Sequence, residues 1–245
     1  MKILAASILI SLLFFLFACQ TGQEKAASEQ TKDITAMVSP EQEVTTALDS
    51  MEAYKMPGDA EKTASTFFRR GLELVKGGQY EEGIEYLGRA IEADPDNGRI
   101  WFNRGFAYYS QQNYDIAQED FDQVIRLNPF DTTAFLYSGL TKYYQEDYPG
   151  ALQDYTNAII KSKAYSTAWY NRGICKGQLK DYKGALDDFT KAISINSNYP
   201  EAYFNRAIAN FYLRDTLKAC EDWRQAKALG SFKAQEALNI YCGGR

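Results

Sequence analysis

A period of 34 residues runs through the chain from Ala64, and it constrains the fold more than any other feature of the sequence. With Ala64 as position 1, position 4 is aromatic in all five copies, as Phe67, Trp101, Phe135, Trp169 and Tyr203. Position 8 is small in all five, as Gly71, Gly105, Gly139, Gly173 and Ala207. Five copies without insertion or deletion indicate a repeat architecture, in which each unit buries its apolar face against the next.

Within each copy the packing positions fall on two helical faces. Positions 4, 8 and 11 share one face and positions 17, 20, 24 and 27 share another, because residues three or four apart lie on the same side of a helix. Position 16, between them, is mostly a residue type that caps a helix: Gln79, Asn113, Asp147, Asp181 and Asp215. Pro95 and Pro129 at position 32 are typical of a helix end. Each copy is therefore predicted to form two amphipathic helices.

The set of an aromatic residue at position 4, glycine at 8, alanine at 20, an aromatic residue at 24 and proline at 32 resembles the tetratricopeptide repeat. The resemblance implies an all-α fold, a right-handed superhelical solenoid of five 34-residue helix-turn-helix repeats with N- and C-terminal capping helices. The repeat domain is expected over 64–231. Its copies are framed at 64–97, 98–131, 132–165, 166–199 and 200–233, and the C-terminal capping helix is expected at 232–245.

The N-terminus begins "MKILAASILISLLFFLFACQ", with an apolar run that is short for a membrane-spanning helix and typical of a secretory signal. Leu16 to Cys19 resembles the lipobox of bacterial lipoproteins. We therefore expect a lipoprotein signal peptide at 1–18 and lipidation of Cys19, for example with palmitate. An ordinary signal peptide and a retained anchor are the alternatives. Residues 19–39 contain few large apolar residues and are expected to form a flexible tether.

Residues 40–57 carry an apolar stripe at helical spacing, formed by Val44, Leu48, Met51 and Tyr54, and Pro57 with Gly58 ends it. Two interpretations stay open. The segment is an N-terminal capping helix over the first repeat, or it is a self-ligand that lies in the groove of the repeats.

Three further cysteines follow Cys19 in a chain that is expected to be exported. Cys175 lies inside a predicted first helix, where a small buried hydrophobic residue is the default interpretation. Cys220 lies in the last repeat and Cys242 ends the capping stretch, so these two could form a disulfide that joins the cap to the repeat. Two separate buried thiols are the alternative.

Composition argues against several kinds of function. The sequence contains no histidine, which excludes histidine-dependent nucleophiles and helical histidine pairs on zinc. The carboxylate pairs Asp187-Asp188 and Glu221-Asp222 are interpreted as part of a solvated face. A net charge of −5 without a basic stripe disfavours nucleic acid. We expect no catalytic residues, no metal and no cofactor.

The resemblance implies that positions 2, 5, 9, 12 and 13 of the first helices line a concave groove. The residues expected to bind a peptide there are Phe68, Leu72, Phe102, Phe106, Tyr109, Leu136, Leu140, Tyr143, Tyr170, Ile174, Phe204, Ile208 and Phe211. An apolar strip of this length predicts a covering partner, either an external peptide or this chain itself, unless ordinary packing buries it. Asparagine stands at position 6 in three copies, but positions 5 and 9 lack the polar residues with which some members of the family hold a terminal carboxylate.

These features predict a non-catalytic protein-interaction scaffold. It would be tethered by its lipid to a bacterial membrane, expected to be the outer membrane, and would face the periplasm or the cell surface. The groove would bind an apolar peptide or helix of a cell-envelope protein. The alternative is a self-associating structural protein of the envelope, a homo-oligomer without a separate client.

Overall fold

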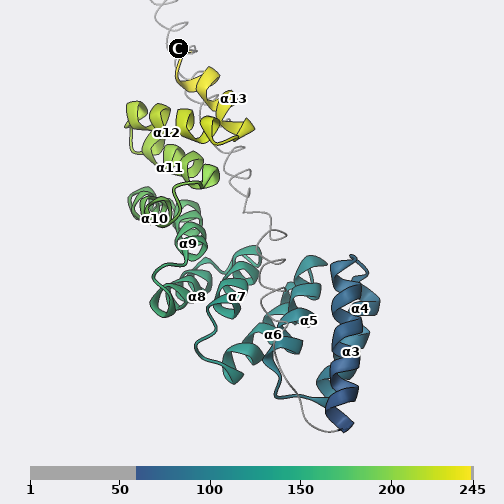
Figure 1. The fold of residues 1–245 in the computed structure, drawn as a ribbon. Helices are drawn as coiled ribbons and strands as arrows, with labels where there is room; N and C mark the ends of the chain where they lie inside the picture. The colour runs from purple at the N-terminus through teal and green to yellow at the C-terminus, as the bar shows by residue number, and fades with distance from the viewer. Residues whose placement is uncertain (1–58, 244–245) are drawn as a thin grey trace, which may run out of the picture. The chain divides into compact units, whose positions relative to one another are not determined.

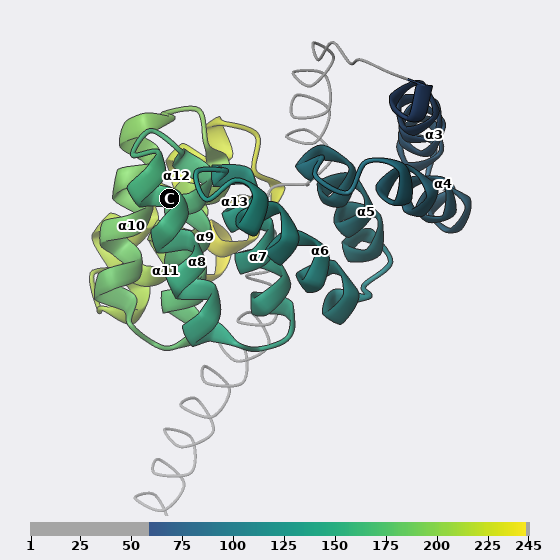
Figure 2. The ribbon, with the colours of Figure 1, turned by 90° about the horizontal axis from the view of Figure 1, so that it is seen from below.

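The computed structural model describes residues 59–243, all of which belong to one compact unit of the chain, residues 43–245. Eleven α-helices and no strand occur in the described range (Figure 1). Each helix packs against the next along the chain, so neighbours in sequence are neighbours in space. Figure 2 gives a second view, in which α3 and α4 again lie side by side at one end of the series and α11 to α13 at the other. The predicted all-α solenoid fold is confirmed.

The helices form five pairs followed by a single helix. Their bounds are α3 Asp59–Lys76 with α4 Tyr80–Ala93, α5 Gly98–Ser110 with α6 Tyr114–Leu127, α7 Thr132–Tyr144 with α8 Tyr148–Lys161, α9 Ser166–Gln178 with α10 Tyr182–Ile195, α11 Pro200–Tyr212 with α12 Thr216–Ala228, and α13 Phe232–Tyr241. The four later first helices begin at position 1 of the 34-residue frame. The first, α3, begins five residues before it.

The break inside each pair has a common backbone geometry. Position 15 has a positive φ in every copy, at Gly78, Gln112, Glu146, Lys180 and Arg214. This left-handed residue ends the first helix, as it does at many helix C-termini. At position 16 the side chains of Asp147, Asp181 and Asp215 accept a backbone N–H of the second helix, as predicted, whereas Gln79 and Asn113 make no such bond. The break therefore depends on position 15 in all copies and on a side-chain cap in three.

Glycine at position 8 makes room for the large side chain at position 24 of the same copy. A Cβ atom added at Gly139 would lie 2.6 Å from the Tyr155 ring, and one added at Gly173 would lie 2.7 Å from the Phe189 ring. Both rings are buried. Since carbon atoms in contact are normally about 3.5–4.0 Å apart, only the missing side chain allows the two helices of a pair to approach this closely.

The last helix, α13, closes the series by packing against α12. Its buried face includes Ala234 and Leu238, which join Trp223 of α12 in one apolar cluster. A disulfide connects Cys220 in α12 to Cys242, the residue after α13. The structure thus brings together the two cysteines for which a bond was expected, and it places the capping helix where the sequence predicts one.

Candidate functional site: the inner face of the first helices

The first helices of the pairs form a layer of their own. Successive first helices contact one another, at α3 with α5, α5 with α7, α7 with α9 and α9 with α11. Among the described helices, successive second helices do not approach one another to the same extent. When the helices of one layer lie nearer to one another than the helices of the other layer, the stack curves, and the tightly spaced layer is on the concave side. The first helices are therefore the inner side, where the predicted groove residues lie.

The thirteen predicted groove residues divide into two groups by burial. The buried group consists of Phe102, Phe106, Tyr109, Leu136, Leu140, Tyr143, Tyr170 and Ile174, all in the second, third and fourth copies. The half-buried group consists of Phe68 and Leu72 in the first copy and Phe204, Ile208 and Phe211 in the fifth. Apolar side-chain surface is thus accessible at the two ends of the inner face more than in its middle. The role of all thirteen as ligand contacts stays a prediction.

In the middle of the face, aromatic packing between copies accounts for much of the burial. Tyr137 occupies position 6 of the third copy and is itself buried. Its ring meets three rings of the second copy edge-on, with centroid distances of 5.3 Å to Phe102, 5.8 Å to Phe106 and 5.8 Å to Tyr109. Edge-to-face contacts at these distances are favourable. These side chains therefore join successive repeats, whatever else they do.

The buried polar groups of the face are unsuited to acid–base chemistry. Burial raises the pKa of Tyr109, Tyr143 and Tyr170 well above the ordinary value for tyrosine, so their hydroxyls stay neutral at physiological pH. Burial also raises the pKa of the Cys175 thiol to about 12, and its Sγ donates to the backbone oxygen of Tyr148 at 3.3 Å. None of these groups supplies a base or a thiolate.

Position 6 carries a different kind of polar group in three copies. Asn103, Asn171 and Asn205 are buried, and the Oδ1 atom of each has no hydrogen-bond donor. In two of these residues, a hydrogen bond from the amide nitrogen fixes the orientation of the amide group. Nδ2 of Asn103 donates to the backbone oxygen of Arg99 at 2.7 Å, and Nδ2 of Asn205 donates to the Tyr170 hydroxyl at 2.9 Å. The inner layer therefore contains a repeated acceptor without a donor.

The first two copies also carry cations close to Phe68 in space or in sequence. The Arg99 guanidinium lies over the Phe68 ring, 5.6 Å from its centroid, and links α5 to α3 by a cation–π contact. Its Nε is buried and has no hydrogen-bond partner, and burial lowers the pKa of Arg99. Arg69, next to Phe68 on α3, is exposed and makes no ion pair with a described residue.

At the other end of the face, Phe204, Ile208 and Phe211 pack partly against the cluster that holds α13 in place. The Phe211 ring lies 4.8 Å from the Tyr241 ring and 6.1 Å from the Trp223 ring. These three side chains are only half-buried, so part of their apolar surface is accessible to solvent. The fifth copy therefore combines side chains that are held by packing with apolar surface that a ligand can contact.

Sequence reasoning missed a periodic ion pair that joins the two helices of a copy. Arginine at position 7 pairs with aspartate at position 23 in three copies, as Arg104–Asp120, Arg172–Asp188 and Arg206–Asp222, each through two hydrogen bonds of 2.7–2.9 Å. In the third copy Ser138 and Lys142 both donate to Asp154 instead. The expectation that Asp188 and Asp222 belong to a solvated face is wrong, because both are buried in these pairs. The 16-residue spacing of arginine and aspartate was the available signal.

The same arginine accounts for part of a five-residue phrase, W-x-N-R-G, that the sequence contains at 101–105 and at 169–173. The guanidinium of Arg104 lies 5.0 Å from the Trp101 ring centroid, and that of Arg172 lies 4.8 Å from the Trp169 ring centroid. Tryptophan, arginine and glycine at positions 4, 7 and 8 thus serve helix packing and the buried ion pair. This accounts for their recurrence without any ligand.

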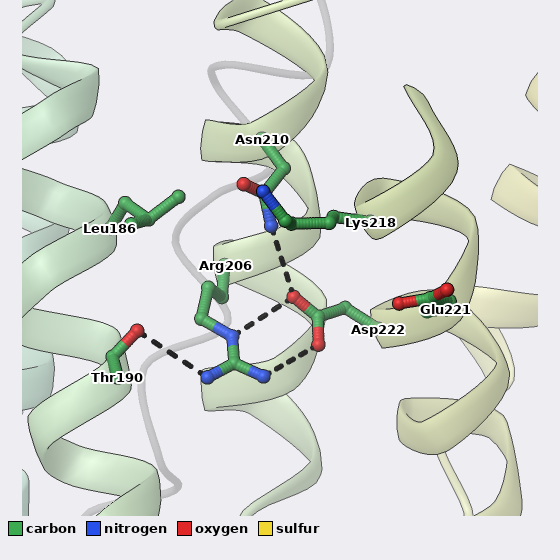
Figure 3. A pocket seen from close by; sticks show the side chains of 7 residues that line it. All are labelled: Leu186, Thr190, Arg206, Asn210, Lys218, Glu221 and Asp222. Carbon is green, nitrogen blue, oxygen red and sulfur yellow. Dashed lines mark hydrogen bonds and ion pairs between the residues drawn. The ribbon is translucent and has the colours of Figure 1, made fainter. Parts of the chain in front are cut away.

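A pocket of about 290 Å³ is lined by residues of α10, α11 and α12 (Figure 3). Figure 3 shows Arg206 inside it, bonded to Asp222 and to Thr190. Lys218, also in the lining, is paired with Asp215 at 2.6 Å. Both cations of the pocket are therefore already neutralised, and we assign no ligand to it.

Two further observations concern residues 59–243. No group of three metal-binding side chains occurs there. No helix in that range has the length and apolar character that a membrane span needs. The expected signal peptide at 1–18, Cys19, the expected tether at 19–39 and the segment 40–57 lie outside the described residues.

Comparisons with known proteins agree with this architecture. Two family models, both described as tetratricopeptide repeat, match the chain, one at residues 68–131 and 107–141 and the other at 166–199. A search of curated proteins finds no match.

Several solved structures share the fold. A MamA fragment from Desulfovibrio magneticus RS-1 aligns with a TM-score of 0.65 and 19% identity, over 70% of this chain and 96% of that one. PilF of Pseudomonas aeruginosa aligns with a TM-score of 0.63 and 20% identity, over 69% and 78%. YrrB, described as a repeat protein with an unusual peptide-binding site, aligns with a TM-score of 0.61 and 18% identity, over 80% and 97%. At these identities the likeness concerns the fold alone.

Proposed function

We propose that this chain, which is a tetratricopeptide-repeat protein, is a non-catalytic scaffold that binds a peptide segment of another protein on the inner face of its first helices. Among the described residues, Cys175 is buried with a raised pKa, and no group of three metal-binding side chains occurs. The peptide-binding site named for YrrB, which shares the fold, is consistent with such a role but is a property of that protein.

The observation that carries the proposal is the repeated, donor-less Oδ1 of Asn103, Asn171 and Asn205. A buried acceptor without a donor costs about 1–3 kcal/mol, so each is unfavourable in the free protein. A bound peptide carries backbone N–H groups at regular intervals, and these are suitable donors. Asn171 and Asn205 lie in successive copies, so one peptide lying along the first helices could satisfy both once the side chains that cover them move aside, whereas a small ligand would reach a single one.

The fifth copy is the best place for the ligand's side chains. Asn205 lies on the same helix as Phe204, Ile208 and Phe211, whose apolar surface is only half-buried. An apolar side chain of a partner placed there would remove this surface from water at about 25 cal/mol per Å². The ligand class is therefore a peptide or helix with apolar anchors and free backbone donors.

We further propose that a lipid on Cys19 holds the scaffold at a bacterial membrane and that its partner is a cell-envelope protein. The support is the resemblance of Leu16 to Cys19 to a lipobox and the signal-like segment before it. Anchoring both proteins in one envelope would raise their effective concentration without adding contacts. Mass spectrometry of the protein purified from membranes tests this, since an unmodified Cys19 would contradict it.

The binding proposal is tested by site-specific photocrosslinking in living cells. A photoreactive residue replaces Phe204 on the inner face, and the matched control carries it at Leu217 of α12, which is 80% exposed and lies on a second helix. We expect a discrete foreign protein to crosslink at 204 and not at 217. Equal crosslinking of a foreign protein at both sites would refute binding on the inner face. Capture of nothing but further copies of this chain would refute the scaffold and favour self-association.

A further inference from the structure

We infer that residues 40–57, the acidic segment directly ahead of α3, dock against the inner face of the first two copies, beside Arg99. This would make the N-terminal end of the inner face a site for the chain itself and leave the fifth copy for a partner. The inference rests on the proposed function only in treating the inner face as a peptide-binding surface.

The receiving surface combines apolar area with uncompensated positive charge. Phe68 and Leu72 of α3 are half-buried, the Arg99 guanidinium lies over the Phe68 ring, and Arg69 follows Phe68 in the sequence. Neither arginine forms an ion pair with a described residue, in contrast to Arg104, Arg172 and Arg206, each of which has a buried aspartate partner. Arg99 thus brings an unpaired cation to the Phe68 ring, and Arg69 is the residue after Phe68 on α3.

Arg99 is the sharper of the two signals. A guanidinium N–H that is buried without an acceptor is unfavourable, and buried cations in proteins are normally paired with carboxylates. The Nε of Arg99 is in that condition. Burial also lowers the pKa of Arg99, as expected for a cation that lacks a compensating anion. A carboxylate that reached the accessible part of the guanidinium would offset its lost hydration, and a turn of the side chain would bring the Nε–H to the same partner.

The segment 40–57, "PEQEVTTALDSMEAYKMP", has the complementary chemistry. It carries four carboxylates, at Glu41, Glu43, Asp49 and Glu52, against the single ammonium of Lys55. Its apolar residues Val44, Leu48, Met51 and Tyr54 recur at helical spacing, and Asp49 and Glu52 directly follow two of them. Apolar anchors that are followed by acids match a surface on which the Arg99 guanidinium lies over the half-buried Phe68 ring.

Chain length and connection allow this placement. The segment ends at residue 57, and α3 begins at Asp59. An 18-residue helix would be about 27 Å long, which is enough to cross two neighbouring helices about 8–10 Å apart. Because the segment is covalently attached beside its site, it meets the surface at a high effective concentration that a separate acidic peptide would have to exceed.

The test places a photoreactive residue at Leu48 of the purified full-length chain and maps the crosslinks by mass spectrometry. We expect intramolecular crosslinks to α3 and α5. The Arg99→Glu substitution should lower their yield at least fivefold, and adding Asp49→Lys with Glu52→Lys should restore it by reversing the charges. The matched control is Arg89→Glu on α4, an exposed arginine on a second helix, which should leave the yield unchanged.

Three outcomes would overturn the inference: an unchanged yield in the Arg99→Glu variant, crosslinks confined to second helices, or crosslinks only between isotopically labelled and unlabelled copies. If Arg99→Glu alters the far-ultraviolet circular dichroism spectrum, the wild-type chain supplies the second measurement. Its crosslink yield should then fall in 0.5 M salt, and insensitivity to salt would count against an ionic contact. Crosslinking of a partner at position 204 is a separate measurement. If a partner still crosslinks at 204 while residue 48 does not crosslink to α3 or α5, this inference is refuted and the proposed scaffold function is not affected.

Discussion

The substitution Gly139→Ala tests the packing principle of the whole series, because it adds a single carbon atom where two helices of a pair meet. The new Cβ would lie 2.6 Å from Cε1 and 2.8 Å from Cδ1 of Tyr155. Both distances fall about 1 Å short of ordinary carbon–carbon contact. Tyr155 is fully buried, so its ring has no free space into which it can turn.

The expected magnitude follows from two opposing terms. Overpacking a well-ordered core costs about 1–3 kcal/mol, whereas alanine in place of glycine inside a helix gains about 0.5–1 kcal/mol. The overpacking term should prevail, and we expect Gly139→Ala to lower the free energy of unfolding by about 1–2 kcal/mol. For a protein of this size the melting temperature should fall by about 2–4 °C for each kcal/mol.

Gly177→Ala is the matched control. Gly177 lies within helix α9, and a Cβ atom added there meets nothing within 4 Å. Only the helix-propensity term remains, so this variant should be about 0.5–1 kcal/mol more stable than the wild type. Urea unfolding followed by circular dichroism at 222 nm measures both variants. A Gly139→Ala variant as stable as the wild type would refute the view that position 8 is glycine because position 24 needs the space.

Three other predictions concern single features of the structure. Lys180 has a φ of +62°, a conformation that L residues adopt at a cost, so Lys180→Gly should raise the free energy of unfolding by about 0.5–1 kcal/mol in the same urea assay. Burial raises the pKa of Asp120, and the ion pair with Arg104 opposes that rise. The substitution Arg104→Met would leave the Asp120 carboxylate without its cation, so it should lower the free energy of unfolding by about 3–5 kcal/mol at neutral pH. Because a raised pKa favours the protonated folded state, stability falls as pH rises through that pKa. The loss in Arg104→Met should therefore shrink toward pH 4, which unfolding at several pH values would show; a pH-independent loss would contradict the pairing. The Cys220–Cys242 disulfide closes a loop with a sequence separation of 22, so its reduction should lower the free energy of unfolding by about 3 kcal/mol. Hydrogen exchange should then increase first in α13. Unchanged exchange in α13 would show that the disulfide does not hold the capping helix in place.

Much of the fold was predictable because the repeat specifies local structure many times over. The helix-spaced apolar positions predicted every helix pair, and the amphipathic stretch after Gly230 predicted α13. The helix ends were less predictable. The second helices of the third and fourth copies stop at Lys161 and Ile195, in register with those that precede Pro95 and Pro129, although neither copy has a proline at position 32. Proline at position 32 is therefore not required for that boundary.

The candidate site was less accessible to sequence reasoning. The groove residues could be placed on one helical face, but how much of each remained exposed could not be derived. Tyr137 shows why: a tyrosine at position 6 covers three aromatic side chains of the copy before it, and such a contact depends on the distance between copies. The unsatisfied Nε of Arg99 is a property of the same kind, since it exists only because no carboxylate of a neighbouring helix reaches it.

The sequence by itself determined that this protein is a series of paired helices, because a 34-residue period of apolar, small and helix-capping residues permits no other regular burial of its apolar faces. It also determined where two cysteines could meet. Only the tertiary structure decided which apolar side chains remain available to a ligand, which charges are paired, and which polar atoms lack partners. These properties depend on contacts between residues of different helices and copies, and the spacing of residues along the chain does not specify those distances.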